Sequence, residues 1–165
     1  MIKEKFVFLD IDGVLNPNVN IHMRKKKGEP TSADYIKLPG DKLYRLKRIC
    51  RDTSAKVVVS SSWRIGFDKY MNPSPAYMNF YNQAIAYNIP VIGWTPLHND
   101  RNRGREISHW LMVFIKQNGY KPVYVIIDDN ISDIVSLHKG HIIQTTTLLG
   151  LQDEHVNITI SILNR

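Results

Sequence analysis

Two aspartates stand one residue apart directly after a short apolar run, a spacing that suits metal-assisted chemistry on phosphate. The run Phe6–Leu9 leads into Asp10, Asp12 and Gly13. Alternate residues of a strand leave on the same side, and the glycine allows a sharp turn. Paired carboxylates repel each other unless a cation lies between them, and oxygen ligands favour Mg²⁺. One carboxylate can attack phosphorus while the other transfers protons. The alternative is a surface turn, since Asp-Gly is a common turn pair.

A second acidic pair, Asp128 and Asp129, stands at the end of another apolar run, with Asp133 four residues beyond Asp129. This pair could complete a Mg²⁺ shell if its strand end lies beside the first. The alternative is a cap for the following helix. Two acidic pairs at matching strand ends favour a metal site over chance.

Hydroxyl and guanidinium groups mark two further positions. Ser60 ends a valine run and is followed by Ser61 and Arg64, a pattern typical of a phosphate cradle or, alternatively, of a helix cap. Arg103 and Arg105 stand at the start of the strongest predicted helix. Arginine there can bind phosphate bidentately, and the alternative is a solvated basic helix start. Positive charge at that end opposes the helix dipole, which favours the functional interpretation.

Five short apolar runs, spaced along the whole chain, predict the elements that position these residues. Continuous β-branched runs indicate parallel strands covered on both faces. The predicted strands are Phe6–Leu9, Lys56–Ser60, Ile89–Gly93, Val123–Asp128 and His141–Thr145. Helical patterns lie between them, so we expect an α/β fold with a doubly wound, Rossmann-like parallel sheet of about five strands. Such sheets bind ligands beyond the carboxyl ends of their strands.

Helices are predicted from apolar periodicity. The clearest covers Arg105–Gln117 and stops at Asn118-Gly119. Asp41 is expected to cap a second helix, and a shorter helix is expected over Ile131–His138. The segment Leu148–Arg165 fits either a helix or a strand.

Two polar stretches interrupt this alternation and could overhang the site. Residues 16–40 are basic, with Arg24–Gly28 expected at a loop tip. Residues 65–88 are rich in Tyr, Asn and Pro, with a helix expected near Tyr77–Tyr87. We therefore expect one domain over residues 1–165, with a flap or small cap at 16–40 and a possible lid at 65–88.

Bulk composition narrows the class of protein. The chain has 165 residues, which suits one globular domain, and no apolar run approaches the roughly 20 residues of a membrane helix. Its single cysteine, Cys50, excludes an internal disulfide, so we expect a soluble cytoplasmic protein with no membrane partner. The net charge of +7 suits an anionic partner, although many soluble proteins carry such a charge without one. The oligomeric state, monomer or homodimer, stays open.

Taken in order, these motifs resemble the haloacid dehalogenase (HAD) superfamily of phosphohydrolases. The match runs through Phe8–Leu15, Val58–Ser60, Arg103 and Ile127–Asp129. The resemblance implies a HAD-like fold with a small cap, Mg²⁺ as cofactor and an aspartyl-phosphate intermediate.

The resemblance also implies a role for each matched residue. Asp10 is expected to be the nucleophile, and Asp12 the general acid and then the general base. Ser60 would bind the phosphate. Asp128 and Asp129 would hold Mg²⁺ beside Asp10 and the main-chain carbonyl of Asp12.

The third motif of the superfamily is usually lysine, whereas this chain offers arginines. We prefer Arg103 to Arg105 for that role. The remaining expected substrate-binding residues are Gly13, Ser61, Arg64 and Arg105.

Shorter motifs resemble a small HAD branch found in RNA-repair fusion proteins of phage and bacteria. These are Ser-Ser-Ser-Trp-Arg, Gly-Trp-Thr-Pro and Arg-Gly-x-Glu-Ile-x-x-Trp-Leu. The resemblance implies a nucleotide or nucleic-acid phosphate ester as substrate and, for a phage protein, the host cytoplasm as location.

Three functions follow as hypotheses. The first is a Mg²⁺-dependent phosphatase acting on a nucleotide or nucleic-acid terminus. The second is a protein that sequesters a nucleotide-derived signalling molecule with little turnover, because a pocket that misaligns the phosphate would bind without cleaving. The third is a nucleic-acid-binding module of a repair complex.

Overall fold

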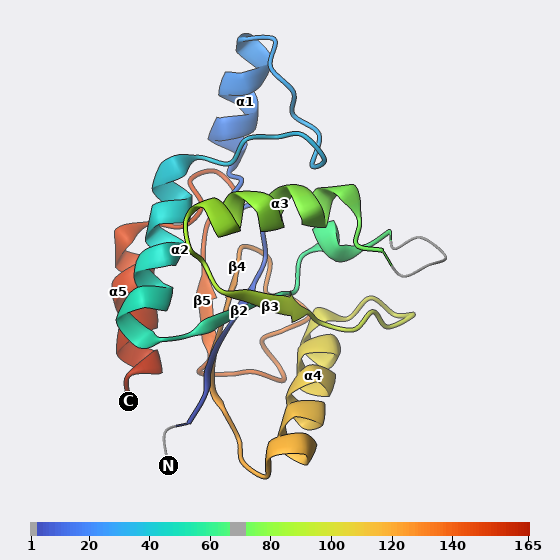
Figure 1. Cartoon of the computed structure of the whole chain (residues 1–165), viewed down its shortest axis with the longest axis vertical. Coiled ribbons are helices and arrows are strands. Elements are labelled where there is room, and N and C mark those ends of the chain that lie inside the picture. The colour runs from blue at the N-terminus through green and yellow to red at the C-terminus, as the bar shows by residue number, and fades with distance from the viewer. Residues whose placement is uncertain (1–2, 67–71) are drawn as a thin grey trace.

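Five parallel strands form one sheet in the order β3-β2-β1-β4-β5, so β1 lies at its centre. The computed structural model describes residues 3–66 and 72–165 (Figure 1). The strands are β1 (Lys5–Leu9), β2 (Lys56–Val59), β3 (Val91–Trp94), β4 (Val123–Asp128) and β5 (Ile142–Gln144). The predicted α/β class and parallel sheet are confirmed.

Strand β3 begins two residues later than predicted. The apolar run starts at Ile89, but Pro90 has no N–H to donate to a ladder, so regular pairing starts at Val91.

Alternate residues of the central strand face two separate cores. Val7 and Leu9 belong to one buried cluster, whereas Phe6 and Phe8 belong to the other. This arrangement explains why the strand sequences are continuously apolar: both faces of the sheet are covered.

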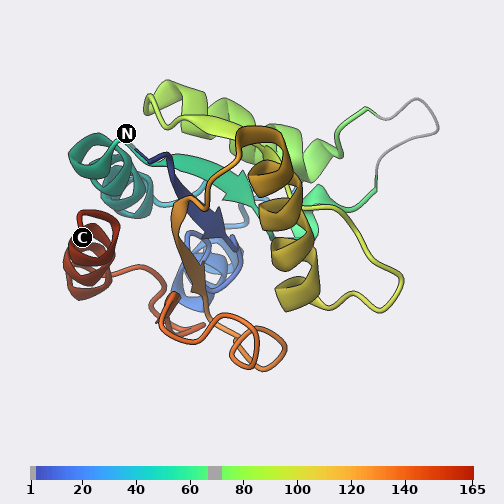
Figure 2. The ribbon, with the colours of Figure 1, turned by 90° about the horizontal axis from the view of Figure 1, so that it is seen from below.

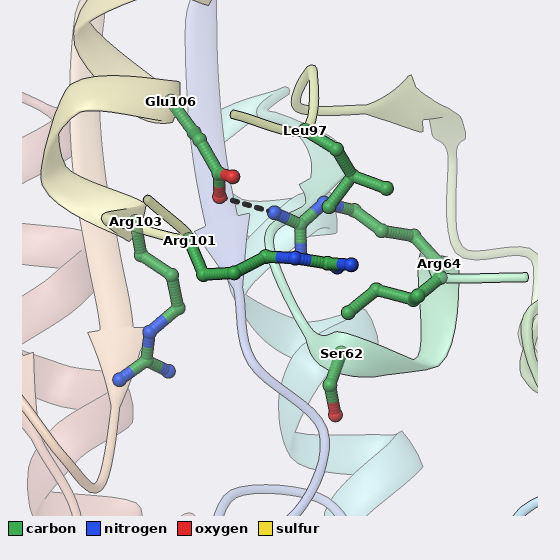
Figure 3. A pocket seen from close by; sticks show the side chains of 7 residues that line it. Ser62, Arg64, Leu97, Arg101, Arg103 and Glu106 are labelled. Carbon is green, nitrogen blue, oxygen red and sulfur yellow. Dashed lines mark hydrogen bonds and ion pairs between the residues drawn. The ribbon is translucent and has the colours of Figure 1, made fainter. Parts of the chain in front are cut away.

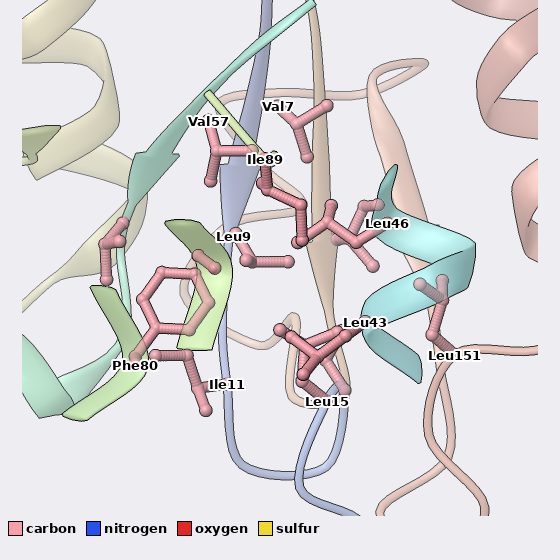
Figure 4. Packing of buried hydrophobic residues seen from close by; sticks show 14 of the residues in the cluster. Val7, Leu9, Ile11, Leu15, Leu43, Leu46, Val57, Phe80, Ile89 and Leu151 are labelled. Carbon is pink, nitrogen blue, oxygen red and sulfur yellow. The ribbon is translucent and has the colours of Figure 1, made fainter. Parts of the chain in front are cut away.

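Three helices cover the first face (Figure 4): α2 (Gly40–Thr53), α3 (Pro75–Ala86) and α5 (Asp153–Leu163). Leu43 and Leu46 of α2 and Phe80 of α3 pack there against the strands.

The C-terminal segment, which the sequence left open, is helical. In α5, Val156, Thr159 and Leu163 are buried at helical spacing. The β-branched residues of this segment favour a strand, but the buried stripe packs against α2 and the sheet, and this packing stabilises the helix.

One long helix, α4 (Arg103–Asn118), covers the second face (Figure 2). Its Ile107, Leu111 and Phe114 pack onto the sheet. Gly119 ends the helix with a φ of 77°, as predicted. The helix begins two residues earlier than expected because the Asn102 side chain accepts a hydrogen bond from the Arg105 N–H.

One predicted helix and one predicted helix cap were wrong. Residues 131–138 form a series of turns instead of a helix. There Asp133 accepts a hydrogen bond from the Arg103 N–H and His138 bonds the Gly104 carbonyl, so contacts with the start of α4 override the local pattern. Asp41 is not the cap of α2: Pro39 holds that position, and Asp41 lies in the first turn, paired with Arg45.

The polar stretch 16–40 contains helix α1 (Asn18–Lys26), which projects beyond the end of the sheet (Figure 1). Arg24–Lys26 form its last turn, so only Lys27 and Gly28 lie in the turn we expected for the whole basic run.

The stretch 65–88, which we expected as a possible lid, contains helix α3 and the segment that precedes it. Its helix α3 buries Ala76, Tyr77, Phe80 and Ala84 in the core, so this part supports the sheet. The remaining part includes residues 67–71, which lie outside the described residues. No described helix has the length and apolar character needed to cross a bilayer.

Candidate active site

Three carboxylates converge where β1 and β4 end. These strands are neighbours and pair Leu9 with Ile127, so Asp10 and Asp128 follow at the same edge of the sheet. Ligand atoms of Asp10, Asp128 and Asp129 all lie within 4.8 Å of one another. The two acidic pairs of the sequence therefore contribute to a single cluster.

Burial makes this cluster electrostatically unfavourable by itself. Burial raises the pKa of Asp10 to about 6, opposed by a hydrogen bond from Ser61 and by the charge of Arg103. The pKa of Asp128 rises to about 7, through burial and then through repulsion by Asp10. A cation beside Asp10 and Asp128 would favour their ionised forms, and a ligand set of oxygen atoms alone fits Mg²⁺.

Gly13 gives Asp129 its place in the cluster. The φ of Gly13 is +71°, and a Cβ built there would lie 2.1 Å from Asp129 Oδ2. The Thr147 hydroxyl donates a hydrogen bond to the same oxygen at 2.5 Å, and the Thr145 hydroxyl donates to the Gly13 carbonyl at 2.8 Å. The loop after β5 thus orients both residues, a role that sequence reasoning missed.

Asp12 lies beside the cluster without joining it. Its carboxylate accepts hydrogen bonds from Asn16 Nδ2 at 2.7 Å and from Trp63 Nε1 at 2.8 Å. The Asp12 side chain therefore lies outside the carboxylate cluster, and a contact between its main-chain carbonyl and Mg²⁺ stays a prediction. Sequence reasoning missed both donors.

Arg103 reaches into the acidic cluster from the start of α4. Its Nη1 lies 2.6 Å from Asp128 Oδ2 and 3.7 Å from Asp10 Oδ2. Arg105 points elsewhere: it is largely exposed and pairs with Asp100 at 2.8 Å. Of the two arginines, Arg103 is the one positioned to hold a phosphate against Asp10.

A comparison with protein families assigns the chain. A family model described as the HAD domain in Swiss Army Knife RNA repair proteins matches residues 6–156. The chain belongs to this family. Searches of the curated proteins and of the solved structures found no match. The HAD assignment supports phosphohydrolase-type chemistry connected with RNA repair, and HAD domains typically use Mg²⁺.

Two serines follow β2 next to the carboxylate cluster. Ser60 and Ser61 are fully buried, and Ser61 hydrogen-bonds Asp10. Within the described part of the chain, the Ser60 hydroxyl has no hydrogen-bond partner. A buried hydroxyl without a partner is costly, and a bound phosphate oxygen would satisfy it.

Arg64 has different partners from the substrate phosphate that we expected. Its guanidinium donates to the carbonyls of Thr95, Ser60 and Ser61 and to the buried carboxylate of Glu106 (Figure 3). Four of its five N–H donors are thus used inside the protein. Arg64 therefore links the segment Ser60–Ser62, called the serine loop below, to α4 and to Thr95 at the end of β3.

A cavity of about 380 Å³ opens beside Asp10, Asp12 and Asp129. Its other wall comes from the 16–40 flap and contains Asn16, Asn18, Ile21, Thr31 and Ala33. A leaving group near Asp12 would therefore contact both Trp63 and the flap.

Proposed function

We propose that the chain is a Mg²⁺-dependent phosphatase that removes phosphate from a nucleotide or a nucleic-acid terminus through an aspartyl-phosphate. The observation that carries this proposal is the arrangement around Asp10. Acidic groups that can hold a cation, Arg103 and Ser61 all lie next to this carboxylate. The neighbouring Ser60 hydroxyl is buried and has no hydrogen-bond partner among the described residues.

In the first step, an Asp10 carboxylate oxygen forms a bond to phosphorus as the bond to the leaving oxygen breaks. Asp12 gives its proton to that oxygen. Arg103 and Ser60 bind the equatorial phosphate oxygens, where charge develops.

In the second step, water attacks phosphorus and the bond to Asp10 breaks. Asp12 accepts the proton of the water, which returns both carboxyl groups to their starting states. The two N–H donors on Asp12 keep its carboxylate aimed at the cavity during both steps.

Asp10, Asp128 and Asp129 would hold Mg²⁺, which supplies positive charge to the phosphate oxygens when bound. Arg103 favours the ionised form of Asp10 that the attack requires.

Two observations support a nucleotide or nucleic-acid substrate. The net charge is +7, and Lys25, Lys26 and Lys27 are exposed on the flap that borders the cavity. The family is named for RNA repair proteins.

A nucleotide-binding protein with little turnover is the second candidate. It is favoured by the contact between Arg103 and Asp128, because a protein cation already lies among the carboxylates. Such a cation would compete with Mg²⁺ and leave an anion-binding pocket that turns over slowly.

Phosphate release from a panel of mononucleotides, phosphorylated oligonucleotides and cyclic or ADP-ribose-type nucleotides separates the two. Wild type, Asp10→Asn and the control Asp34→Asn, which changes an exposed carboxylate, would be compared with Mg²⁺. We expect turnover of one class that Asp10→Asn abolishes and Asp34→Asn retains. Tight binding by the wild type with no release would reject the phosphatase and favour the binding protein.

A further inference from the structure

A second cavity, of about 330 Å³, adjoins the carboxylate site (Figure 3). Arg103 and Ser62 form part of its wall. Because Arg103 also contacts Asp128, this cavity begins one side chain away from the acidic cluster. Arg103 therefore lies between the acidic cluster and this second cavity.

The charges around this cavity are unbalanced. Arg64, Arg101 and Arg103 line it, together with a single carboxylate, Glu106. Arg64 occupies Glu106, and Arg103 is held by Asp128. Arg101 has no ion pair within residues 3–66 and 72–165, and Figure 3 shows its side chain extending across the cavity toward Arg64. A recess with surplus positive charge attracts an anion.

The backbone fixes the position of Arg101. Its φ is +53°, a left-handed conformation that is unfavourable for a residue with a side chain. The Arg101 N–H donates to the His98 carbonyl at 3.1 Å, and Asn102 directly caps α4. The turn that presents Arg101 is thus anchored at both ends.

Apolar groups supply the remainder of the wall. Ile65 and Leu97 are 38% and 39% exposed, and both line the cavity. Free phosphate would leave these surfaces in water, whereas a ribose or base would cover them. The lining therefore fits an anion that is joined to a nucleoside.

We propose that this cavity binds the nucleoside and phosphodiester next to the terminal phosphate, with Arg101 contacting the phosphodiester. The substrate is then the end of a nucleic-acid strand and not a free mononucleotide. This inference rests on the proposed phosphatase function, which it makes more specific.

The test compares kcat/KM for dinucleotides that carry a 5′ or a 3′ phosphate with kcat/KM for the corresponding mononucleotides. We expect the wild type to prefer one dinucleotide by tenfold or more, and Arg101→Gln to lower that preference at least fivefold. Arg51→Gln, an exposed arginine at the far end of α2, is the matched control and should retain it.

Equal kcat/KM for dinucleotide and mononucleotide would overturn the inference, as would a preference that survives Arg101→Gln. If no substrate releases phosphate, the phosphatase proposal fails instead. Calorimetry then tests independently whether the cavity binds the ligand. It would measure binding of the same ligands to Asp10→Asn with and without Arg101→Gln. A dinucleotide preference that requires Arg101 supports the subsite, and its absence rejects it.

Discussion

The carboxylate of Asp129 occupies the space that a side chain at position 13 would need. Gly13→Ala should therefore displace Asp129 and weaken Mg²⁺ binding at least tenfold, measured by titration calorimetry. Gly28→Ala is a matched control, because Gly28 has a similar φ of +67° but nothing within 4 Å of the added Cβ. Both variants should lose about 1 kcal/mol of stability through backbone strain. Equal Mg²⁺ affinity in the two variants would contradict the assigned role of Gly13.

The raised pKa values of Asp10 and Asp128 predict how stability without metal depends on pH. Between the usual pKa of 3.8 and about 7, the folded protein retains protons that the unfolded chain has lost. The contribution to stability is therefore full below the usual pKa and is lost as the pH rises through about 6 to 7.

Asp128→Asn tests this dependence. Without Mg²⁺, the wild type should lose on the order of 2 kcal/mol of unfolding free energy from this source between pH 5 and 8, and the variant should lose less. Urea unfolding at several pH values, with Asp34→Asn as control, measures the difference. Mg²⁺ should restore the wild type at pH 8. Identical pH dependence in wild type and Asp128→Asn would refute the prediction.

Residue types at strand ends indicated the carboxylates and the serines, whereas the preference for Arg103 rested on the family resemblance. The structure brings Asp10, Asp128, Asp129, Ser61 and Arg103 together. The partners of these groups were harder to predict. No sequence pattern marks Trp63 as a hydrogen-bond donor to Asp12. The two residues are 51 positions apart in the chain, and only the fold brings the indole to the carboxylate. Arg64 was assigned to the substrate because two of its buried partners, the Thr95 carbonyl and the Glu106 carboxylate, come from other parts of the chain.

At the scale of elements, the pair formed by Arg64 and Glu106 joins the serine loop to α4. Both side chains are at most 2% exposed. Glu106→Gln leaves the guanidinium without its counter-charge and should cost about 3 kcal/mol of unfolding free energy. Denaturant unfolding would measure this loss, and Asp153→Asn, which removes exposed ion pairs with Arg45, should have a much smaller effect. Comparable losses in the two variants would show that the buried pair does not hold this loop.

A long apolar stripe predicted a helix correctly, whereas a short one did not. Helix α4 was predicted because its apolar stripe, from Ile107 to Phe114, continues over about two turns. The turns at 131–138 were mistaken for a helix because their apolar residues also repeat at helical spacing. Their geometry is set by Asp133 and His138, which bond the first turn of α4.

At the scale of the whole molecule, the sheet topology determines which residues meet. The strand order places β1 and β4 side by side, which brings together acidic pairs that are separated by more than a hundred residues. The pattern of apolar runs predicted the sheet class and the edge that carries the site. The projection of α1 from the body depends on tertiary structure, and composition indicated only that the flap is basic.

The lysines of α1 and its following turn should bind oligonucleotides through their phosphates. Replacing Lys25, Lys26 and Lys27 with glutamine should weaken oligonucleotide binding. It should also lower the slope of log affinity against log salt by up to about 2 for a single strand. Fluorescence anisotropy at several salt concentrations measures both effects. Lys116→Gln, on the last turn of α4, serves as control, and an unchanged slope in the triple variant would exclude the flap from the binding surface.

The most direct test of the central claim is detection of phosphate on Asp10 during turnover. Wild type mixed with its best substrate and Mg²⁺ would be quenched in acid, digested with trypsin and examined by mass spectrometry. We predict one added phosphoryl group on the peptide 6–24, at Asp10, and none in Asp10→Asn. Rapid phosphate release with no phosphorylated peptide at any quench time would contradict the aspartyl-phosphate route.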